Sequence, residues 1–371
     1  MSVSRTKDER DVHHMMRATQ AIPRGLALLL ACWLVGACAA TPATSPPSDA
    51  QPTAIAPAVA TASPSSFESF APSAGAALPA TAGATSAGGS PAPIPGGRLA
   101  YGRFSPGGTH SFTANTDGTD EQRLLSSRAE GATWSPDGSR LAVNADNPQG
   151  LLFVGLVSPD GSGYVQFHSP DPTLNLGCAP WSPDGSRLAC EAWDDTDVTR
   201  NGIYTVRTSD GGDLIRVTTS PVGTKDVAPG DFSPDGRQIV FLRADPPDEE
   251  HLTLMVVNID GTGERAITDV KVGMWCSWSP DGKTILTEAN GSLLLVPLDG
   301  RQPSPIKVAA NAPVTATRGA WSPDGTWIVF SRVSSAGEDI YIMRKDGTNL
   351  HQVTNTPGQD EEFGDWGVAA P

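Results

Sequence analysis

The chain has 371 residues and a formal net charge of −15, a length that suits one large domain or two ordinary ones. Its first 37 residues carry five Lys or Arg and three Asp or Glu, whereas the rest carries 21 basic and 38 acidic residues, a net charge of −17. Such an acidic surface repels the phosphate backbone and anionic lipid headgroups. The composition therefore argues against a nucleic-acid-binding protein.

The first segment, residues 1–37, has the pattern of a targeting signal rather than of a folded domain. The apolar run GLALLLACWLVGA at Gly25–Ala37 is too short for a stable membrane-spanning helix, but it suits a signal-peptide core. The run leads into VGAC, which resembles the lipobox of bacterial lipoproteins and implies that Cys38 is diacylated. We therefore expect an extracytoplasmic protein, lipid-anchored to the cell membrane or outer membrane of a bacterium. The alternative is a signal anchor, or a secretory peptide cut near Ala40.

Residues 38–97 are a low-complexity stretch of Ala, Pro, Ser, Thr and Gly, in which Asp49 and Glu68 are the only charges. Such a composition cannot bury enough apolar surface to offset the chain entropy lost on folding. We expect a disordered stalk that spans about 45 Å as a flexible coil and up to about 180 Å as polyproline II.

The remainder, residues 98–371, is repetitive. WSPDG or FSPDG recurs at spacings of 47, 51, 46 and 43 residues, and an apolar strand follows each copy. A second apolar strand then leads to an Asp-Gly pair, and a short third strand closes each unit. The aromatic residues of the first motif are Trp134, Trp181, Phe232, Trp278 and Trp321, and the Asp-Gly pairs begin at Asp117, Asp160, Asp210, Asp260, Asp299 and Asp346.

Both motifs predict tight turns between antiparallel strands. Proline presets the φ angle at the second turn position, aspartate favours the third, and glycine supplies the left-handed residue, so SPDG predicts a three-residue hairpin loop. Asp-Gly between apolar runs is a hairpin signal as well. Each unit therefore has four strands, A to D, with SPDG joining A to B and Asp-Gly joining C to D, as in propeller blades.

Counting these turns predicts how the domain closes. There are six C–D turns but five SPDG hairpins, and the first unit opens at Arg98 with a strand B. Trp366 falls 45 residues after Trp321, in the position of a strand A with nothing after it. The predicted fold is all-β, a six-bladed propeller whose C-terminal strand completes blade 1 and removes the exposed edges. Seven blades would require a further degenerate repeat.

The repeat resembles the WD40-like (PD40) propeller repeat of the TolB family, and the resemblance covers residues 98–367. It is specific for the fold and poorly specific for function. The TolB protein itself, for which the family is named, carries an α/β domain before its propeller, and here the predicted stalk takes its place. The resemblance therefore does not imply participation in Tol-Pal transport.

Catalytic motifs are absent from the sequence. No Gly-x-Ser-x-Gly nucleophile elbow occurs, and the histidines outside the signal segment show no metal-binding spacing. These are His110, His168, His251 and His351. We predict a binding protein rather than an enzyme. The alternative is a lyase or hydrolase that acts on a small molecule or polysaccharide at the mouth of the central channel.

Acidic residues form the candidate ligand-binding site. The SPDG aspartates, Asp137, Asp184, Asp235, Asp281 and Asp324, are expected to have structural roles in their turns. The B–C loop of blade 3, WDDTDVTRNG, is the candidate, and ADPPDEEH in blade 4 is a second acidic loop. Neither has the spacing of a calcium loop, so a solvated acidic loop is favoured over a calcium site and no cofactor is predicted. The candidate residues are Trp193, Asp194, Asp195, Asp197 and Asn201.

Two cysteines face each other in the predicted register. With a three-residue turn, Ser182 opposes Ser186, so Cys178 opposes Cys190 at a distance compatible with a disulfide. A disulfide and two free buried thiols are both consistent with the sequence. Cys276 has no partner in this register.

Recognition is expected on the B–C and D–A loops, which vary in length and sequence, whereas the turns on the opposite side are short and repetitive. We expect a monomeric propeller that binds a protein, a peptide or a cell-envelope glycan, and whose contact with the membrane is through the lipid on Cys38.

Overall fold

The structure is a computed structural model that describes residues 94–105, 108–146, 152–167, 170–246, 248–308, 315–334 and 337–368. The predicted signal peptide, Cys38 and all of the predicted stalk before Ile94 lie outside the described residues. Within the described ranges, no helix is long and apolar enough to cross a membrane. The described chain is built of strands, with one short 3-10 helix, η1 (Val198–Arg200).

Four of the sheets have four antiparallel strands each, in chain order from one edge to the other. The first contains β4 (Glu130–Trp134), β5 (Leu141–Asp146), β6 (Leu152–Val157) and β7 (Val165–Gln166). The second contains β8 (Asn175–Trp181), β9 (Arg187–Trp193), β10 (Gly202–Arg207) and β11 (Ile215–Arg216). The third contains β12 (Lys225–Phe232), β13 (Gln238–Asp245), β14 (Asp248–Asn258) and β15 (Arg265–Ala266). The fourth contains β16 (Cys276–Trp278), β17 (Thr284–Ala289), β18 (Ser292–Pro297) and β19 (Ser304–Pro305).

The remaining eight strands form one sheet made of two antiparallel groups. One group contains β20 (Thr315–Trp321), β21 (Trp327–Ser334), β22 (Gly337–Arg344) and β23 (His351–Gln352). The other contains β24 (Asp360–Gly367), β1 (Arg98–Ser105), β2 (Gly108–Asn115) and β3 (Gln122–Arg123). A single parallel pair, Glu338 with Asp360, joins the two groups. The last strand of the chain, β24, therefore pairs with the first, β1.

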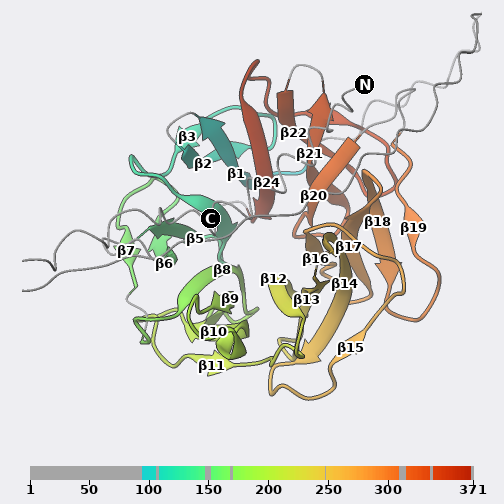
Figure 1. The fold of residues 1–371 in the computed structure, drawn as a ribbon. Helices are drawn as coiled ribbons and strands as arrows, with labels where there is room; N and C mark the ends of the chain where they lie inside the picture. The colour runs from blue at the N-terminus through green and yellow to red at the C-terminus, as the bar shows by residue number, and fades with distance from the viewer. Residues whose placement is uncertain are drawn as a thin grey trace, which may run out of the picture. The chain divides into compact units, whose positions relative to one another are not determined.

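The sheets have a propeller-like arrangement, visible in Figure 1. The first strand of each group lies innermost, and β4, β8, β12, β16, β20 and β24 each contact the next strand in this series. The strand β24 also contacts β4. Each of the six innermost strands therefore contacts the innermost strand of the group before it and of the group after it.

Apolar side chains fill the space between neighbouring sheets. In one such cluster, Ala189 and Ile203 pack with Phe232, Phe241 and Met255 of the following sheet. Burying a side chain of this size stabilises the fold by about 1.5–3 kcal/mol. Four of the five motif aromatics are 7% exposed, the exception being Trp181, which is half-buried. The aromatic residue of the repeat is thus mainly a packing residue.

Neighbouring sheets are also joined by polar side chains that reach from a second strand to the next innermost strand. Asn144 on β5 donates to the carbonyl of Cys178 at 2.8 Å and accepts its N–H at 2.9 Å. Glu191 accepts the N–H of Ala228, and Glu288 accepts that of Arg318. Ala228 and Arg318 have φ angles of 42° and 53°, and such a local bulge directs an N–H away from its own ladder.

The SPDG turns differ from the prediction by one residue. Gly138 donates to the carbonyl of Ser135 at 2.9 Å, as expected for a type I turn, but Ser135 donates to the carbonyl of Arg140, which leaves a four-residue loop. The hydroxyl of Ser135 accepts the N–H of Arg140 at 3.0 Å. The side chain therefore replaces one backbone ladder bond, and the predicted three-residue loop is wrong.

The same correction applies at Ser182, which pairs with Arg187 rather than Ser186. A bulge between Cys178 and Trp181 then shifts the register back by one residue, and Cys178 lies opposite Cys190. Their sulfurs are bonded at 1.98 Å, and both residues are fully buried. Cys276 is a buried free thiol.

Candidate functional site

All A–B and C–D turns lie at one end of their sheets, which we call the turn end, because neighbouring strands are antiparallel. Each aspartate of the SPDG and Asp-Gly motifs uses its carboxylate within its own turn, accepting the N–H of the residue two positions later at 2.9–3.2 Å. These carboxylates are therefore structural. They belong to Asp117, Asp137, Asp160, Asp184, Asp210, Asp235, Asp260, Asp281, Asp299, Asp324 and Asp346.

Hydrogen bonding keeps the turn carboxylates ionised. The hydroxyl of Ser135 and the backbone N–H of Ser139 lower the pKa of Asp137 to about 2. The Arg207 guanidinium, which donates to Asp210, lowers the pKa of that carboxyl to about 2. The pKa of each of the other nine turn aspartates is lowered as well.

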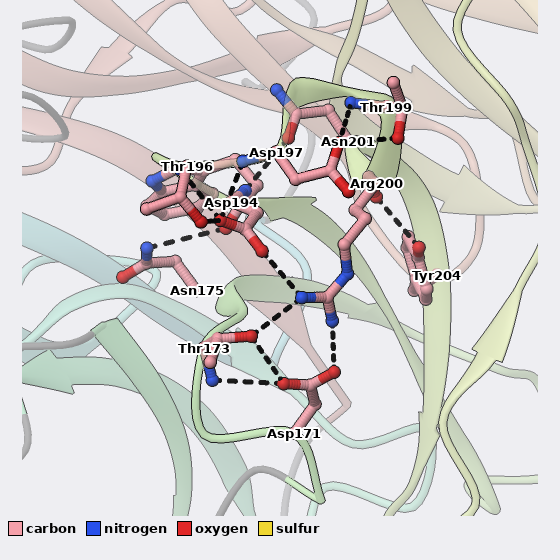
Figure 2. A network of polar contacts seen from close by, with 11 residues as sticks. Asp171, Thr173, Asn175, Asp194, Thr196, Asp197, Thr199, Arg200, Asn201 and Tyr204 are labelled. Carbon is pink, nitrogen blue, oxygen red and sulfur yellow. Dashed lines mark hydrogen bonds and ion pairs between the residues drawn. The ribbon is translucent and has the colours of Figure 1, made fainter.

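The opposite end, which we call the loop end, carries the B–C and D–A connections. The candidate loop joins β9 to β10 and contains η1, and Asp194 lies at its centre (Figure 2). Asp194 is 4% exposed. Its Oδ1 accepts the N–H and hydroxyl of Thr196 at 2.8 and 2.7 Å and the N–H of Asp197 at 3.1 Å. These bonds, led by the Thr196 hydroxyl, lower the pKa of Asp194 to about 2.

The neighbouring polar residues complete the same loop. Asp197 caps η1 by accepting the N–H of Thr199 at 3.1 Å, a typical role for aspartate before a helical turn. Asn201 accepts the N–H of Asp194 at 2.9 Å through its side-chain oxygen. The structure therefore brings Asp194, Asp197 and Asn201 together, and hydrogen bonds inside the loop engage all three side chains.

Arg200 connects this loop to the D–A connection that precedes β8. Its Nη1 donates to Asp194 Oδ2 at 2.6 Å and to Thr173 at 2.7 Å, and its Nη2 forms an ion pair with Asp171 (Figure 2). Two carboxylates thus share one guanidinium. Asp171, Thr173 and Arg200 were not predicted as site residues. The DPT of the earlier loop does place an aspartate two residues before a threonine, as in the turns elsewhere in the chain.

The two remaining predicted site residues are Trp193 and Asp195. The indole of Trp193 is half-buried and lies over Gly177, where an added β-carbon would be 3.7 Å from it. Asp195 is exposed. The loop end also carries two exposed aliphatic side chains, Val198 in η1, 71% exposed, and Val222 before β12, fully exposed.

The second acidic segment, ADPPDEEH, is mostly strand rather than loop. Asp245 ends β13, and β14 begins at Asp248, so the connection between them is a tight hairpin. Asp245 forms an exposed ion pair with Lys271 at 3.1 Å. The expectation that the whole segment is a loop was therefore wrong, because Asp248 pairs with Asp245; after a bulge, the regular pairing with β13 resumes at Thr253.

Buried arginine networks form a repeated feature that sequence reasoning missed. Arg103 on β1 bonds Glu361 at 2.7 Å and Glu121 at 2.6 Å, and Arg243 on β13 bonds Asp226 at 2.5 Å and Glu264 at 2.7 Å. Both arginines are the sixth residue of their strand. Each links an acidic residue on the innermost strand to a glutamate that directly precedes the outermost strand of the same sheet. Each arginine lies five residues after the first residue of its strand, Arg98 in β1 and Gln238 in β13. This shared spacing could have identified both arginines from the sequence.

The described histidines lie on different strands. His110 is on β2, His251 on β14 and His351 on β23, while His168 lies outside the described residues. Among the residues described, no three His, Cys, Asp or Glu side chains are grouped to hold a metal ion.

No protein-family model matches the chain. Among solved structures, TolB from Acinetobacter baumannii aligns with a TM-score of 0.57 and 18% identity, over 73% of this chain and 66% of that protein, just under two thirds of its length. A putative TolB from Agrobacterium tumefaciens aligns with a TM-score of 0.52 and 18% identity, over 73% of this chain and 98% of the other.

A chain of a nidogen/laminin complex aligns with a TM-score of 0.55 and 10% identity, over 74% of this chain and 99% of the other. Identities this low speak for the fold alone. The described part of the chain is a TolB-like β-propeller, as the repeat predicted.

Proposed function

We propose that the propeller is a closed ring of six blades. Two of its blades lie in the eight-stranded sheet, as the groups β20–β23 and β24 with β1–β3. The succession of contacts between innermost strands, which returns from β24 to β4, supports this closure. Pairing of β24 with β1 supports it as well, because it covers the edge that an open array would leave unpaired.

We also propose that the protein is an extracytoplasmic lipoprotein anchored through Cys38. The disulfide between Cys178 and Cys190 supports this location, because structural disulfides persist mainly in oxidising compartments. The Cys38→Ala variant should appear in the soluble fraction or remain as an unprocessed precursor. A variant that stays membrane-bound with the processing of the wild-type chain would refute the anchor.

The activity that we propose is binding: the chain is a scaffold that holds a protein, peptide or envelope-glycan partner at the loop end. The observation that carries this proposal is the contrast between the two ends. Every aspartate of the turn-end motifs is engaged by its own turn, whereas the loop end presents the exposed Asp195 and Val198 on a loop that Asp194 and Arg200 hold in place. A fixed loop displaying free side chains is typical of recognition surfaces.

The solved nidogen/laminin complex contains a chain with the same fold, a protein bound to another protein. This likeness supports a protein partner over a glycan. Acidic side chains at the loop end favour basic groups on that partner.

The experiment is affinity capture from envelope extract with the full chain and two matched variants. Asp195→Lys changes an exposed loop-end charge, and Asp117→Lys makes the same change at the turn end. We expect the first variant to lose the captured partner and the second to retain it. Retention by both variants, or loss by the second alone, would place recognition elsewhere.

A further inference from the structure

The closing strand β24 is joined to its partner strand differently from the other innermost strands. In the other five groups, an SPDG turn joins the innermost strand to the next strand along the chain. Arg103 of β1 and Glu361 of β24 lie opposite each other but are 258 residues apart in the sequence. The register of β24 against β1 is therefore not set by a turn.

A bulge divides the pairing of β24 with β1 into two halves. The register shifts between Ala100 and Gly102 of β1. On one side of the bulge, the buried Trp366 anchors β24 in an apolar cluster, and on the other side residues 360–362 pair with β1. Because a bulge changes the pairing by one residue, the burial of Trp366 does not by itself determine the partners of residues 360–362.

Two buried ion pairs hold this second half of the strand. Successive side chains of a strand point to opposite faces, and the adjacent Glu361 and Glu362 meet arginines of different neighbours. Glu361 is fully buried and accepts a hydrogen bond from Arg103 Nε on β1 at 2.7 Å. Glu362, 4% exposed, forms an ion pair with Arg318 on β20, which also lies 3.5 Å from Glu338 on β22. The pairs thus connect β24 to both of its neighbours.

The group that begins with β12 offers an internal comparison. Asp226, the second residue of β12, lies opposite Arg243 and accepts from its Nε at 2.5 Å, as Glu361, the second residue of β24, accepts from Arg103. In this group an SPDG turn joins the two strands, and the residue after Asp226 is the uncharged Val227. Relative to β12, the closing strand lacks the turn and has a second ion pair.

We propose that the ion pairs of Glu361 with Arg103 and of Glu362 with Arg318 position the closing strand, a role that the SPDG turn has for the other innermost strands. A buried charge that loses its partner is strongly destabilising. A shifted register that separates either glutamate from its arginine is therefore disfavoured, and charge matching selects the native pairing of residues 360–362. The proposal does not depend on what the protein binds.

The first test is hydrogen–deuterium exchange of the full chain, resolved strand by strand with mass spectrometry. In the double variant Glu361→Gln, Glu362→Gln, we expect the amides of β24 to exchange about tenfold faster relative to those of the other sheets, because the strand opens locally more often. Unchanged exchange in β24 would overturn the proposal.

The matched control is Asp226→Asn. It removes the equivalent carboxylate from β12 and leaves Arg243 paired with Glu264, as Glu361→Gln leaves Arg103 paired with Glu121. Exchange in β12 should change much less than exchange in β24 does, because the SPDG turn still joins β12 to β13. An equal acceleration in β12 would mean that such pairs add packing stability alone, and the positioning role would be wrong.

The second test is a double-mutant cycle on one pair, and it covers the case in which the double glutamate variant fails to fold. Arg103→Gln leaves the buried Glu361 without its cation, whereas Arg103→Gln with Glu361→Gln removes both charges, and Glu121, whose side chain is 37% exposed, remains solvated. If the pair acts as a unit, β24 exchanges no faster in the paired variant than in Arg103→Gln alone. Accelerations that simply add would show that the two side chains act independently, contrary to the proposal.

Discussion

The turn end and the loop end of the propeller are made from the same strands, yet they use acidic residues in different ways. At the turn end, the same bond from the N–H two positions later to the motif aspartate recurs at every motif, with little variation in distance. At the loop end, Thr196 and Arg200 hold Asp194, and Arg200 also donates to Thr173. Among the described connections, this arrangement occurs in one blade only. The repeated turn motifs therefore specify the fold, whereas the loop around Asp194, which differs from the other connections, is where specific recognition is expected.

The largest effect is expected from removing the last strand. Deleting residues 360–371 removes β24, including the buried Trp366, and leaves β1 without its strand partner on that side. We expect the cooperative unfolding transition to be lost in calorimetry, because β24 pairs with β1 and contacts both β4 and β20. Deleting residues 369–371 alone should leave the Tm unchanged. A 360–371 deletion that melted like the intact chain would refute the closed ring.

The next largest effect concerns the disulfide beneath the candidate loop. Cys178 and Cys190 are 12 residues apart in sequence, and closing a loop of this size stabilises a fold by about 3 kcal/mol. The double variant Cys178→Ala, Cys190→Ala should lose about this free energy of unfolding in urea titrations. Cys276→Ala, which removes a buried thiol without a bridge, is the control and should lose less. Equal losses would show that the bridge adds nothing beyond packing.

A smaller effect separates two neighbouring carboxylates. Asp194→Asn should lower the Tm by a few degrees, because an amide nitrogen then opposes either the Arg200 guanidinium or the N–H groups of Thr196 and Asp197. Asp195→Asn should leave the Tm unchanged and weaken partner capture, since that side chain is exposed. Melting curves and capture of both variants give the comparison. Equal melting temperatures would mean that the Asp194 network does not stabilise the loop.

The smallest effect for a single residue is expected at acidic pH. The folded pKa of Asp137 is lowered to about 2, below its unfolded value near 4, so its contribution to stability is present above about pH 4 and lost as the pH falls toward 2. Asp137→Asn should therefore reduce the decline in the urea midpoint between pH 4 and pH 2. Asp195→Asn, which lies outside any SPDG turn, should not. An unchanged decline in Asp137→Asn would show that the turn hydrogen bonds are as strong in the unfolded chain.

The sequence predicted the fold because the residues that define it act locally. Pro, Asp and Gly determine the turn through their own backbone preferences, and the period of the motif then places every strand. The exact loop length was missed because the Ser135 hydroxyl replaces a backbone acceptor. The opposed register of Cys178 and Cys190 was nevertheless predicted correctly, because the bulge compensates for this shift. The sequence left a disulfide and two free thiols both open.

The candidate site was only partly predictable. Asp194, Asp197 and Asn201 lie close together in the sequence and in the fold, but their engagement within the loop depends on geometry. Arg200 reaches Asp171 across 29 residues of chain, and no local pattern reports such a contact.

The most direct measurement of the central claim is site-specific photo-crosslinking in envelope extract. A photoreactive residue placed at Asp195 reports on the loop end, and one placed at Asp117 reports on the turn end. Recognition at the loop end predicts a discrete crosslinked partner from position 195 and none from position 117. The same partner crosslinked from position 117 alone would contradict the division of the propeller into a structural end and a binding end.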